Sequence, residues 1–318
     1  MKRLIGIAFL LVLALSCGQP KKQAAPAPAT REFPMAEVPM MITEPAQRAV
    51  WIAQHFWDAF TKPEKLYYCD SVTVNGVSAD KLEQQVGLFA SILQQIPLPA
   101  GQEAMKAAFG RLEAFQKAQP EGNVFAQTSA LISRYFYDPN SPVRSEDLYL
   151  PYVSLLASSE LVADEDRGQY AWDTRVCQLN RTGTPAADFT FVDTAGRRRT
   201  LYSVKAEYTL LIFGNPDCKA CREIMEEMAA SPEISALIES GRLKVVDVYI
   251  DEDIALWKEK AGTYPKAWIN GYDPDFVVRT DRIYAIRAVP SLYLLDEKKN
   301  VLMKDAPIEQ VLEILPNL

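Results

Sequence analysis

The sequence predicts a two-part fold, with an all-α region followed by an α/β region in which helices flank a mixed sheet. Three observations predict it. Apolar residues recur at helical spacing across residues 44–181. From 182 to 318, short runs rich in β-branched residues alternate with helical segments. The run Thr182-Gly183-Thr184-Pro185 interrupts both patterns, so we place a domain boundary there.

The N-terminal region is expected to fold as a helical domain over residues 44–181. Pro45 suits a first helical turn, and Pro97 and Pro120 mark the ends of the second and third helices. The expected helices cover 45–60, 82–93, 105–115, 125–136, 145–156 and 165–179. Their aromatic residues are interpreted as core, and the sequence assigns this domain no function.

The C-terminal region, 182–318, is expected to alternate strands and helices and to end in an antiparallel hairpin and a helix. Strands are predicted at 188–193, 200–202, 208–213, 243–250, 292–295 and 301–303, and helices at 222–230, 233–241, 254–260 and 308–315. Residues 257–279 are interpreted as an insertion, in which Trp268 and Tyr272 either line a substrate groove or pack in the interior.

The first 17 residues carry the features of a bacterial lipoprotein signal peptide. Lys2 and Arg3 precede a short apolar stretch, which is below the roughly 20 residues that span a bilayer. The stretch ends at Cys17, the expected lipidation site, although Ala14 is an imperfect match to the lipobox. The alternative is an ordinary signal peptide with a coincidental Cys. Residues 18–43, rich in Pro and Ala, are predicted to form a tether.

Both interpretations of the N-terminus place the protein outside the cytoplasm, where disulfides persist. We expect a lipoprotein of the cell envelope that faces the periplasm; the sequence leaves the choice between inner and outer membrane open. The net charge is −7, and the chain has no basic patch of the kind that nucleic acid requires.

The motif that bears the chemistry is Cys218-Lys219-Ala220-Cys221, which follows a predicted buried strand and begins a predicted helix. The free N–H groups of a first helical turn stabilise a thiolate, so Cys218 is the expected nucleophile. Cys221 lies one turn further on the same face and is the expected resolving thiol. This arrangement predicts thiol–disulfide exchange and requires no cofactor.

Half of a zinc site is the alternative interpretation of the pair. Structural zinc takes four Cys or His ligands, whereas this chain has five Cys, one His and no second close pair. We therefore predict no metal. Cys69 and Cys177 are either a structural disulfide or two buried thiols, and His55 is assigned no function.

Residues 184–318 resemble the TlpA-like branch of thioredoxin-fold oxidoreductases. The resemblance rests on the Cys pair at a helix start, the opening Pro185-Ala186-Ala187-Asp188-Phe189, and Val289-Pro290 before a strand. It implies a cis peptide bond at Pro290 and a substrate-docking edge at Val289 and Pro290. The helical region, with its segment 138–144, resembles an uncharacterised domain that precedes thioredoxin folds in Bacteroidetes lipoproteins.

The sequence departs from the family at a buried position. Thioredoxins place a buried Asp six residues before the first Cys, and here that residue is Ile212. Another group must then move the proton of Cys221. Glu252 and Asp251 are equal candidates, and the alternative is that they belong to a solvated acidic cluster.

The resemblance implies an enzyme, a lipid-anchored thiol–disulfide oxidoreductase that reduces disulfide-containing exported proteins. Such an enzyme needs a membrane thiol electron donor, and its contact with the membrane is the lipid on Cys17. The alternative function is a non-catalytic envelope binding protein, in which the helical domain binds a partner and the thioredoxin fold is a scaffold.

Overall fold

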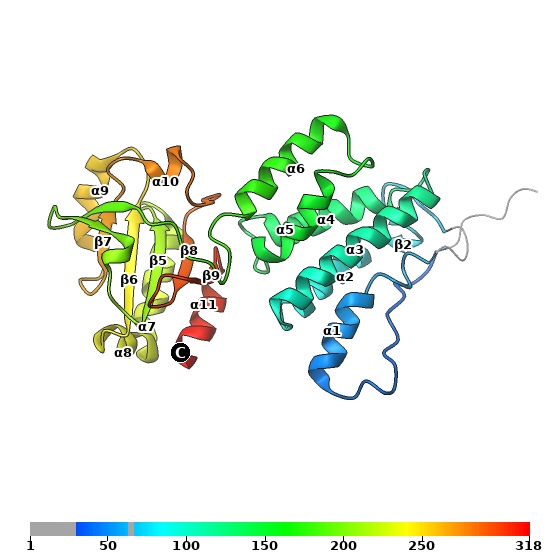
Figure 1. Ribbon diagram of the computed structural model, residues 1–318, viewed down its shortest axis with the longest axis horizontal. Helices are drawn as coiled ribbons and strands as arrows, with labels where there is room; N and C mark the ends of the chain where they lie inside the picture. The colour runs from blue at the N-terminus through cyan, green and yellow to red at the C-terminus, as the bar shows by residue number, and fades with distance from the viewer. Residues whose placement is uncertain (1–29, 63–66) are drawn as a thin grey trace, which may run out of the picture.

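The computed structural model describes residues 30–62 and 67–318 (Figure 1). Helices form one lobe, and a sheet with its flanking helices forms the other, as Figure 1 shows. This arrangement confirms the predicted fold class. Within the described residues, no helix is long and apolar enough to cross a membrane. The predicted signal peptide and Cys17 lie outside the described residues.

The helical lobe packs around one apolar core. Leu82, Val86, Phe89 and Leu93 illustrate how it forms, because their spacing puts all four on one buried helix face. A short hairpin, β1 (Thr73–Val74) and β2 (Val77–Ser78), was not predicted and precedes the second helix. The helices are α1 (Pro45–His55), α2 (Ala79–Gln94), α3 (Leu98–Ala118), α4 (Val124–Tyr137), α5 (Glu146–Leu156) and α6 (Asp164–Cys177).

The second lobe is built on a mixed seven-stranded sheet with the order β4-β3-β7-β6-β5-β8-β9. Strands β5, β6 and β7 run parallel, and the outer strands pair antiparallel. The central strands are apolar on both faces, because both faces are covered. The strands are β3 (Thr190–Asp193), β4 (Arg198–Thr200), β5 (Tyr208–Gly214), β6 (Leu243–Tyr249), β7 (Ile269–Tyr272), β8 (Ser291–Leu295) and β9 (Val301–Lys304).

Two apolar clusters sandwich this sheet. One cluster joins Leu210, Ile212 and Val245 to residues of α7, α8 and α11. The other joins Leu211 and Phe213 to side chains from outside the sheet, including that of Val278 on α10. The helices of this lobe are α7 (Lys219–Ala230), α8 (Pro232–Glu239), α9 (Ile254–Lys260), α10 (Val277–Thr280) and α11 (Ile308–Ile314).

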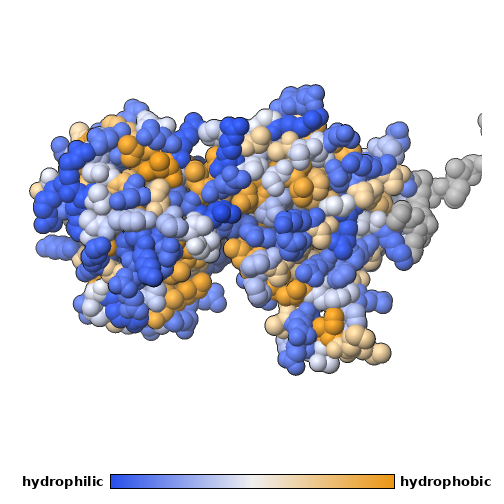
Figure 2. Space-filling model, viewed as in Figure 1, coloured by the Kyte–Doolittle hydropathy of each residue, from blue (hydrophilic) through white to orange (hydrophobic). Residues whose placement is uncertain are grey.

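The edge of the sheet at β9 faces the helical lobe. Lys304 on β9 forms an ion pair of 2.7 Å with Glu146 on α5, and both side chains are buried. Arg287 pairs with Glu146 at 3.0 Å as well. In the space-filling view, the two lobes meet at a waist, beside which hydrophobic residues are visible (Figure 2). The lobes are therefore joined by a buried polar interface in addition to the connecting chain.

Candidate active site

The Cys pair lies where the buried central strand β5 passes into α7. Asn215 and Pro216 turn the chain after β5, and the Asn215 side chain accepts the Asp217 N–H at 2.9 Å. Cys218 is the N-cap residue of α7, so the turn delivers its side chain to the positive end of the helix. Cys218 therefore lies at a helix N-terminus, as the sequence predicts.

The two thiols lie in different environments. The sulfur of Cys218 is half-buried and accepts the Cys221 N–H at 3.3 Å, which is one of the free donors of the first helical turn. Cys221 is buried, at 6% exposure. Burial, together with the neighbouring Cys218 sulfur, raises the pKa of the Cys221 thiol. An incoming sulfur can therefore reach Cys218 before Cys221.

The segment before β8 lies against Cys218. The Cys218 thiol donates to the carbonyl oxygen of Val289 at 3.7 Å. The Val289–Pro290 peptide bond is cis, as the resemblance implies. The structure thus brings together the four residues predicted for catalysis and substrate docking, Cys218, Cys221, Val289 and Pro290.

A residue that the sequence analysis missed, Asp247, lies on the same side of the sheet as Cys221. It pairs in register with Ile212, and strand alternation puts it on the face that α7 covers. Its side chain is 2% exposed, and burial raises its pKa to about 8. The negative charge of Asp247 also contributes to raising the pKa of Cys221.

The surroundings of Asp247 leave part of its carboxyl group without a hydrogen bond. In the part of the chain that the structure describes, its Oδ1 atom is buried without a hydrogen-bond partner, and so is the hydroxyl of Tyr264. Burial, the charge of Asp247 and that of Cys221 raise the pKa of Tyr264. A Cβ atom at Gly214 would lie 2.9 Å from Asp247 Oδ2, so the glycine makes room for the carboxyl. Asp247, Tyr264 and Cys221 therefore form a cluster of buried titratable groups.

The two carboxyl groups that the sequence predicted as proton carriers for Cys221 either pair with other residues or are exposed to solvent. Asp251 accepts from the Asn215 side chain at 2.7 Å and pairs with Arg279 at 2.9 Å. Glu252 is exposed. The insertion residues pack: Trp268 is part of the core beside α7, and Tyr272 lies 4.9 Å from the Trp257 ring.

Cys69 and Cys177 are separate thiols. Cys69 accepts the Asn75 N–H at 3.3 Å, whereas Cys177 is buried near the ion pairs between the lobes. Over the described ranges, no group of three or more His, Cys, Asp or Glu side chains is placed to hold a metal ion. His55 stacks on Trp51 and contacts Asp58 at 2.6 Å.

The sheet order, the Cys pair at a helix start and the cis proline define a thioredoxin-like protein. The crystal structure of a thioredoxin-like protein from Bacteroides caccae ATCC 43185 is 33% identical to this chain, with a TM-score of 0.76. The match covers 90% of this chain and 99% of that one. The family described as "Domain of unknown function (DUF5106)" matches residues 16–180. The chain belongs to this family and joins its helical domain to a thioredoxin-like domain.

Two further solved structures align with part of the chain. A conserved protein of unknown function from Bacteroides fragilis is 39% identical, with a TM-score of 0.42, over 42% of this chain and 98% of its own. The C-terminal domain of an uncharacterized Bacteroides fragilis protein is 44% identical, with a TM-score of 0.42, over 43% of this chain and 97% of its own. No curated protein matches the chain.

Proposed function

We propose that this protein is a thiol–disulfide oxidoreductase that reduces disulfides of exported proteins. The observation that carries the proposal is the half-buried Cys218 sulfur at the N-cap of α7, which accepts a backbone N–H. This contact stabilises negative charge on sulfur, and the exposed part of the side chain leaves a path for a substrate disulfide.

The reaction follows from the order of the two sulfurs. The Cys218 thiolate attacks one sulfur of the substrate disulfide, a mixed disulfide forms, and the other substrate sulfur leaves as a thiolate that takes a proton. Cys221 then loses its proton and attacks Cys218, which releases the second substrate thiolate. The substrate disulfide gains two electrons, and Cys218 and Cys221 end as a disulfide. A membrane thiol donor then returns the two electrons.

Asp247 is the proposed acceptor of the Cys221 proton. A buried thiol with a raised pKa needs a base, and a carboxyl with a pKa of about 8 exchanges protons near neutral pH. A direct transfer or one through a single bridging water would serve. The same carboxyl can return the proton when the pair is reduced again.

Replacing Cys218 tests the proposed reaction. We expect Cys218→Ser to abolish reduction of insulin, and Cys221→Ser to accumulate a mixed disulfide on Cys218 that mass spectrometry detects. Cys69→Ser is the matched control and should keep full activity. Full activity of Cys218→Ser would reject the mechanism, and a Cys218 that resists alkylation at neutral pH would favour the non-catalytic binding protein.

The direction of electron flow has its own measurement. We expect the potential of the Cys218–Cys221 pair, measured against glutathione, to lie well below the about −120 mV of a strong oxidant. A value near −120 mV would reject the reducing direction while leaving the exchange chemistry intact.

The proposed location is the cell envelope, through a lipid on Cys17. The basis is the sequence pattern of residues 1–17 and the Pro- and Ala-rich composition of the residues that follow. Growth with labelled palmitate should label the wild-type protein and leave Cys17→Ala unlabelled. Equal labelling of both would reject Cys17 as the anchor.

A further inference from the structure

A groove of about 310 Å³ begins at Val289 and Pro290 and is lined by both lobes. On the thioredoxin-like side it follows α7 and the start of α11, and on the helical side it is closed by the segment 139–144 between α4 and α5. Because Val289 also contacts Cys218, the groove leads directly away from the nucleophile.

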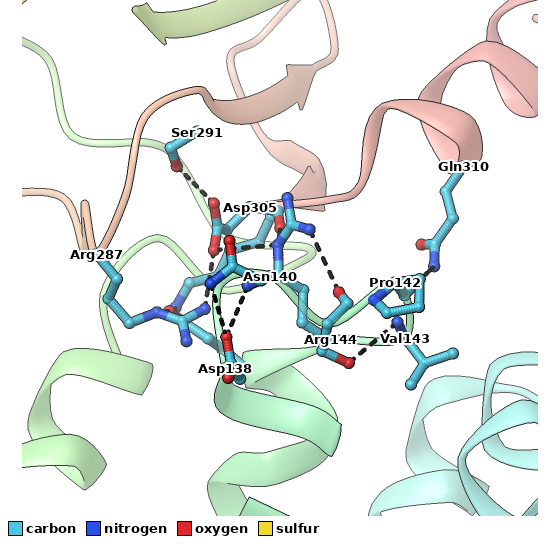
Figure 3. A network of polar contacts seen from close by, with 12 residues as sticks. Asp138, Asn140, Pro142, Val143, Arg144, Arg287, Ser291, Asp305 and Gln310 are labelled. Atoms are coloured by element: carbon cyan, nitrogen blue, oxygen red, sulfur yellow. Dashed lines mark hydrogen bonds and ion pairs between the residues drawn. The ribbon is translucent and has the colours of Figure 1, made fainter. Parts of the chain in front are cut away.

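The helical wall of this groove is fixed to the residues that hold the cis-proline segment. Arg144 Nε donates to the backbone carbonyl of Asp305 at 2.9 Å, and the Asp305 carboxylate accepts from the Ser291 hydroxyl at 2.7 Å. Ser291 directly follows Pro290. Figure 3 shows Arg144, Arg287 and Ser291 converging on Asp305. The helical lobe therefore presents a fixed surface to anything that docks at Pro290.

The lining of the groove is apolar in its floor and acidic at its rim. Its apolar residues include Val289, Pro290 and Ile308, which are partly exposed, and Ile224, Leu292 and Pro307, which are buried. Glu227 and Glu309 are exposed at its rim, and so is Glu223, whose carboxylate pairs with Lys219 at 2.9 Å. The cation among the lining residues, Arg144, is held at Asp305 with 12% of its side chain exposed. An occupant therefore meets apolar surface and negative charge.

We propose that this groove binds the polypeptide segment beside the substrate disulfide, that it favours Lys or Arg next to the cysteine, and that the helical domain serves as its selective wall. The proposal rests on the proposed function and adds to it a substrate class and a role for the helical domain. An extended chain fits because its cysteine meets Cys218 while its neighbouring residues lie along the apolar floor, and its cations face Glu227 and Glu309.

Charge reversal at the rim tests the preference. Two disulfide-linked peptides of equal length, one with Lys and one with Glu beside the cysteine, serve as substrates, and kcat/KM is measured for each. Wild type should favour the Lys peptide by about tenfold at low salt, and the preference should shrink as salt screens it. Glu227→Lys with Glu309→Lys should abolish or invert the ratio.

The matched control changes the same charge on the same helices. Glu226→Lys with Glu313→Lys alters exposed residues of α7 and α11 outside this groove, and should leave the ratio near that of wild type. Equal use of both peptides by wild type, or equal effects of the two double variants, would overturn the preference for basic segments.

A bulky residue on the helical wall tests the role of that domain. Asn140 is an exposed residue of the wall, so Asn140→Trp should lower the ratio of peptide reduction to reduction of hydroxyethyl disulfide by about tenfold. Ala118→Trp, at the exposed end of α3, is the control and should leave the ratio unchanged. An unchanged ratio in Asn140→Trp would overturn the selective wall. Wild-type protein inactive on hydroxyethyl disulfide would instead reject the proposed function.

Discussion

At the scale of single residues, Asp247 shows what one sequence reveals about this site and what it conceals. The Cys pair, its helix-start position and the proline before β8 follow from local patterns of breakers and apolar runs. A carboxyl inside the otherwise apolar stretch 245–250 was a visible signal. The position of Asp247 beside Ile212 could not be read from the sequence, because the register that brings them together forms between strands far apart in the chain.

The position of Asp247 suggests how this chain does without the buried Asp of the family. Thioredoxins place a carboxyl at the position of Ile212, and here the adjacent strand provides one on the same face of the sheet. Gly214 leaves the space that the carboxyl occupies. The acidic run after β6, which contains the candidates Asp251 and Glu252, instead contacts Asn215 and Arg279 through Asp251.

We expect Asp247→Asn to slow the resolving step by about 10²-fold, because Cys221 loses its proton acceptor. The measurement is single-turnover release of a peptide from a preformed mixed disulfide on Cys218. The wild-type rate should rise with an inflection near pH 8, the pKa of Asp247, and the variant should lack that inflection. Asp251→Asn is the control and should keep the wild-type profile. If the inflection were lost in Asp251→Asn and kept in Asp247→Asn, Asp251 would be the proton acceptor of Cys221 instead.

The same substitution has a stability readout with a defined sign. The pKa of Asp247 rises from 3.8 to about 8 on folding, so the native state binds more protons between these values. The unfolding free energy of wild type therefore falls as pH rises from about 4 to about 8. Asp247→Asn lacks this loss and should be more stable than wild type at pH 8, by about 2–5 kcal/mol. Urea unfolding at pH 5 and pH 8 measures the difference.

At the scale of elements, β7 is the strand that the sequence did not reveal. It is four residues long and contains Asn270 and Gly271, which are poor strand formers, and it lies within the segment 257–279 that the sequence analysis interprets as an insertion. Its role is structural, because β7 joins the β3–β4 hairpin to β6. The short helix α10 was not predicted either, whereas the longer strands and helices were predictable, since each has an apolar run or a helical period of its own.

Gly271 is required where β3 pairs closely with β7. A Cβ atom there would lie 2.7 Å from both the Phe191 ring and the Val192 carbonyl oxygen. We expect Gly271→Ala to lower the unfolding free energy by about 1–3 kcal/mol, because the backbone oxygen cannot move aside. Gly110→Ala, in α3 with open space around the added atom, should instead be stabilising by up to about 1 kcal/mol. Urea unfolding compares the two, and equal effects would argue against close packing as the cause.

At the scale of the whole molecule, the two lobes are coupled through charges taken out of water. Glu146 comes from α5, and its partners Lys304 and Arg287 come from the thioredoxin-like lobe. Lys304 Nζ also donates to the Cys177 carbonyl oxygen at 2.8 Å. Charges buried in this way require their partners, so the lobes are held in one relative position. That position is what brings the 139–144 segment to the groove beside Pro290.

Removing the central carboxylate should uncouple the lobes. Glu146→Gln leaves the Lys304 ammonium, whose side chain is 1% exposed, buried without its carboxylate. We expect the unfolding free energy to fall by about 3–5 kcal/mol. We also expect wild type to unfold in a single calorimetric transition and the variant in two, one for each lobe. Glu207→Gln is the control, because its pair with Arg242 is exposed and should contribute less than about 1 kcal/mol. A single transition in Glu146→Gln, with a loss no larger than that of the control, would show that the lobes are held together by their apolar contacts instead.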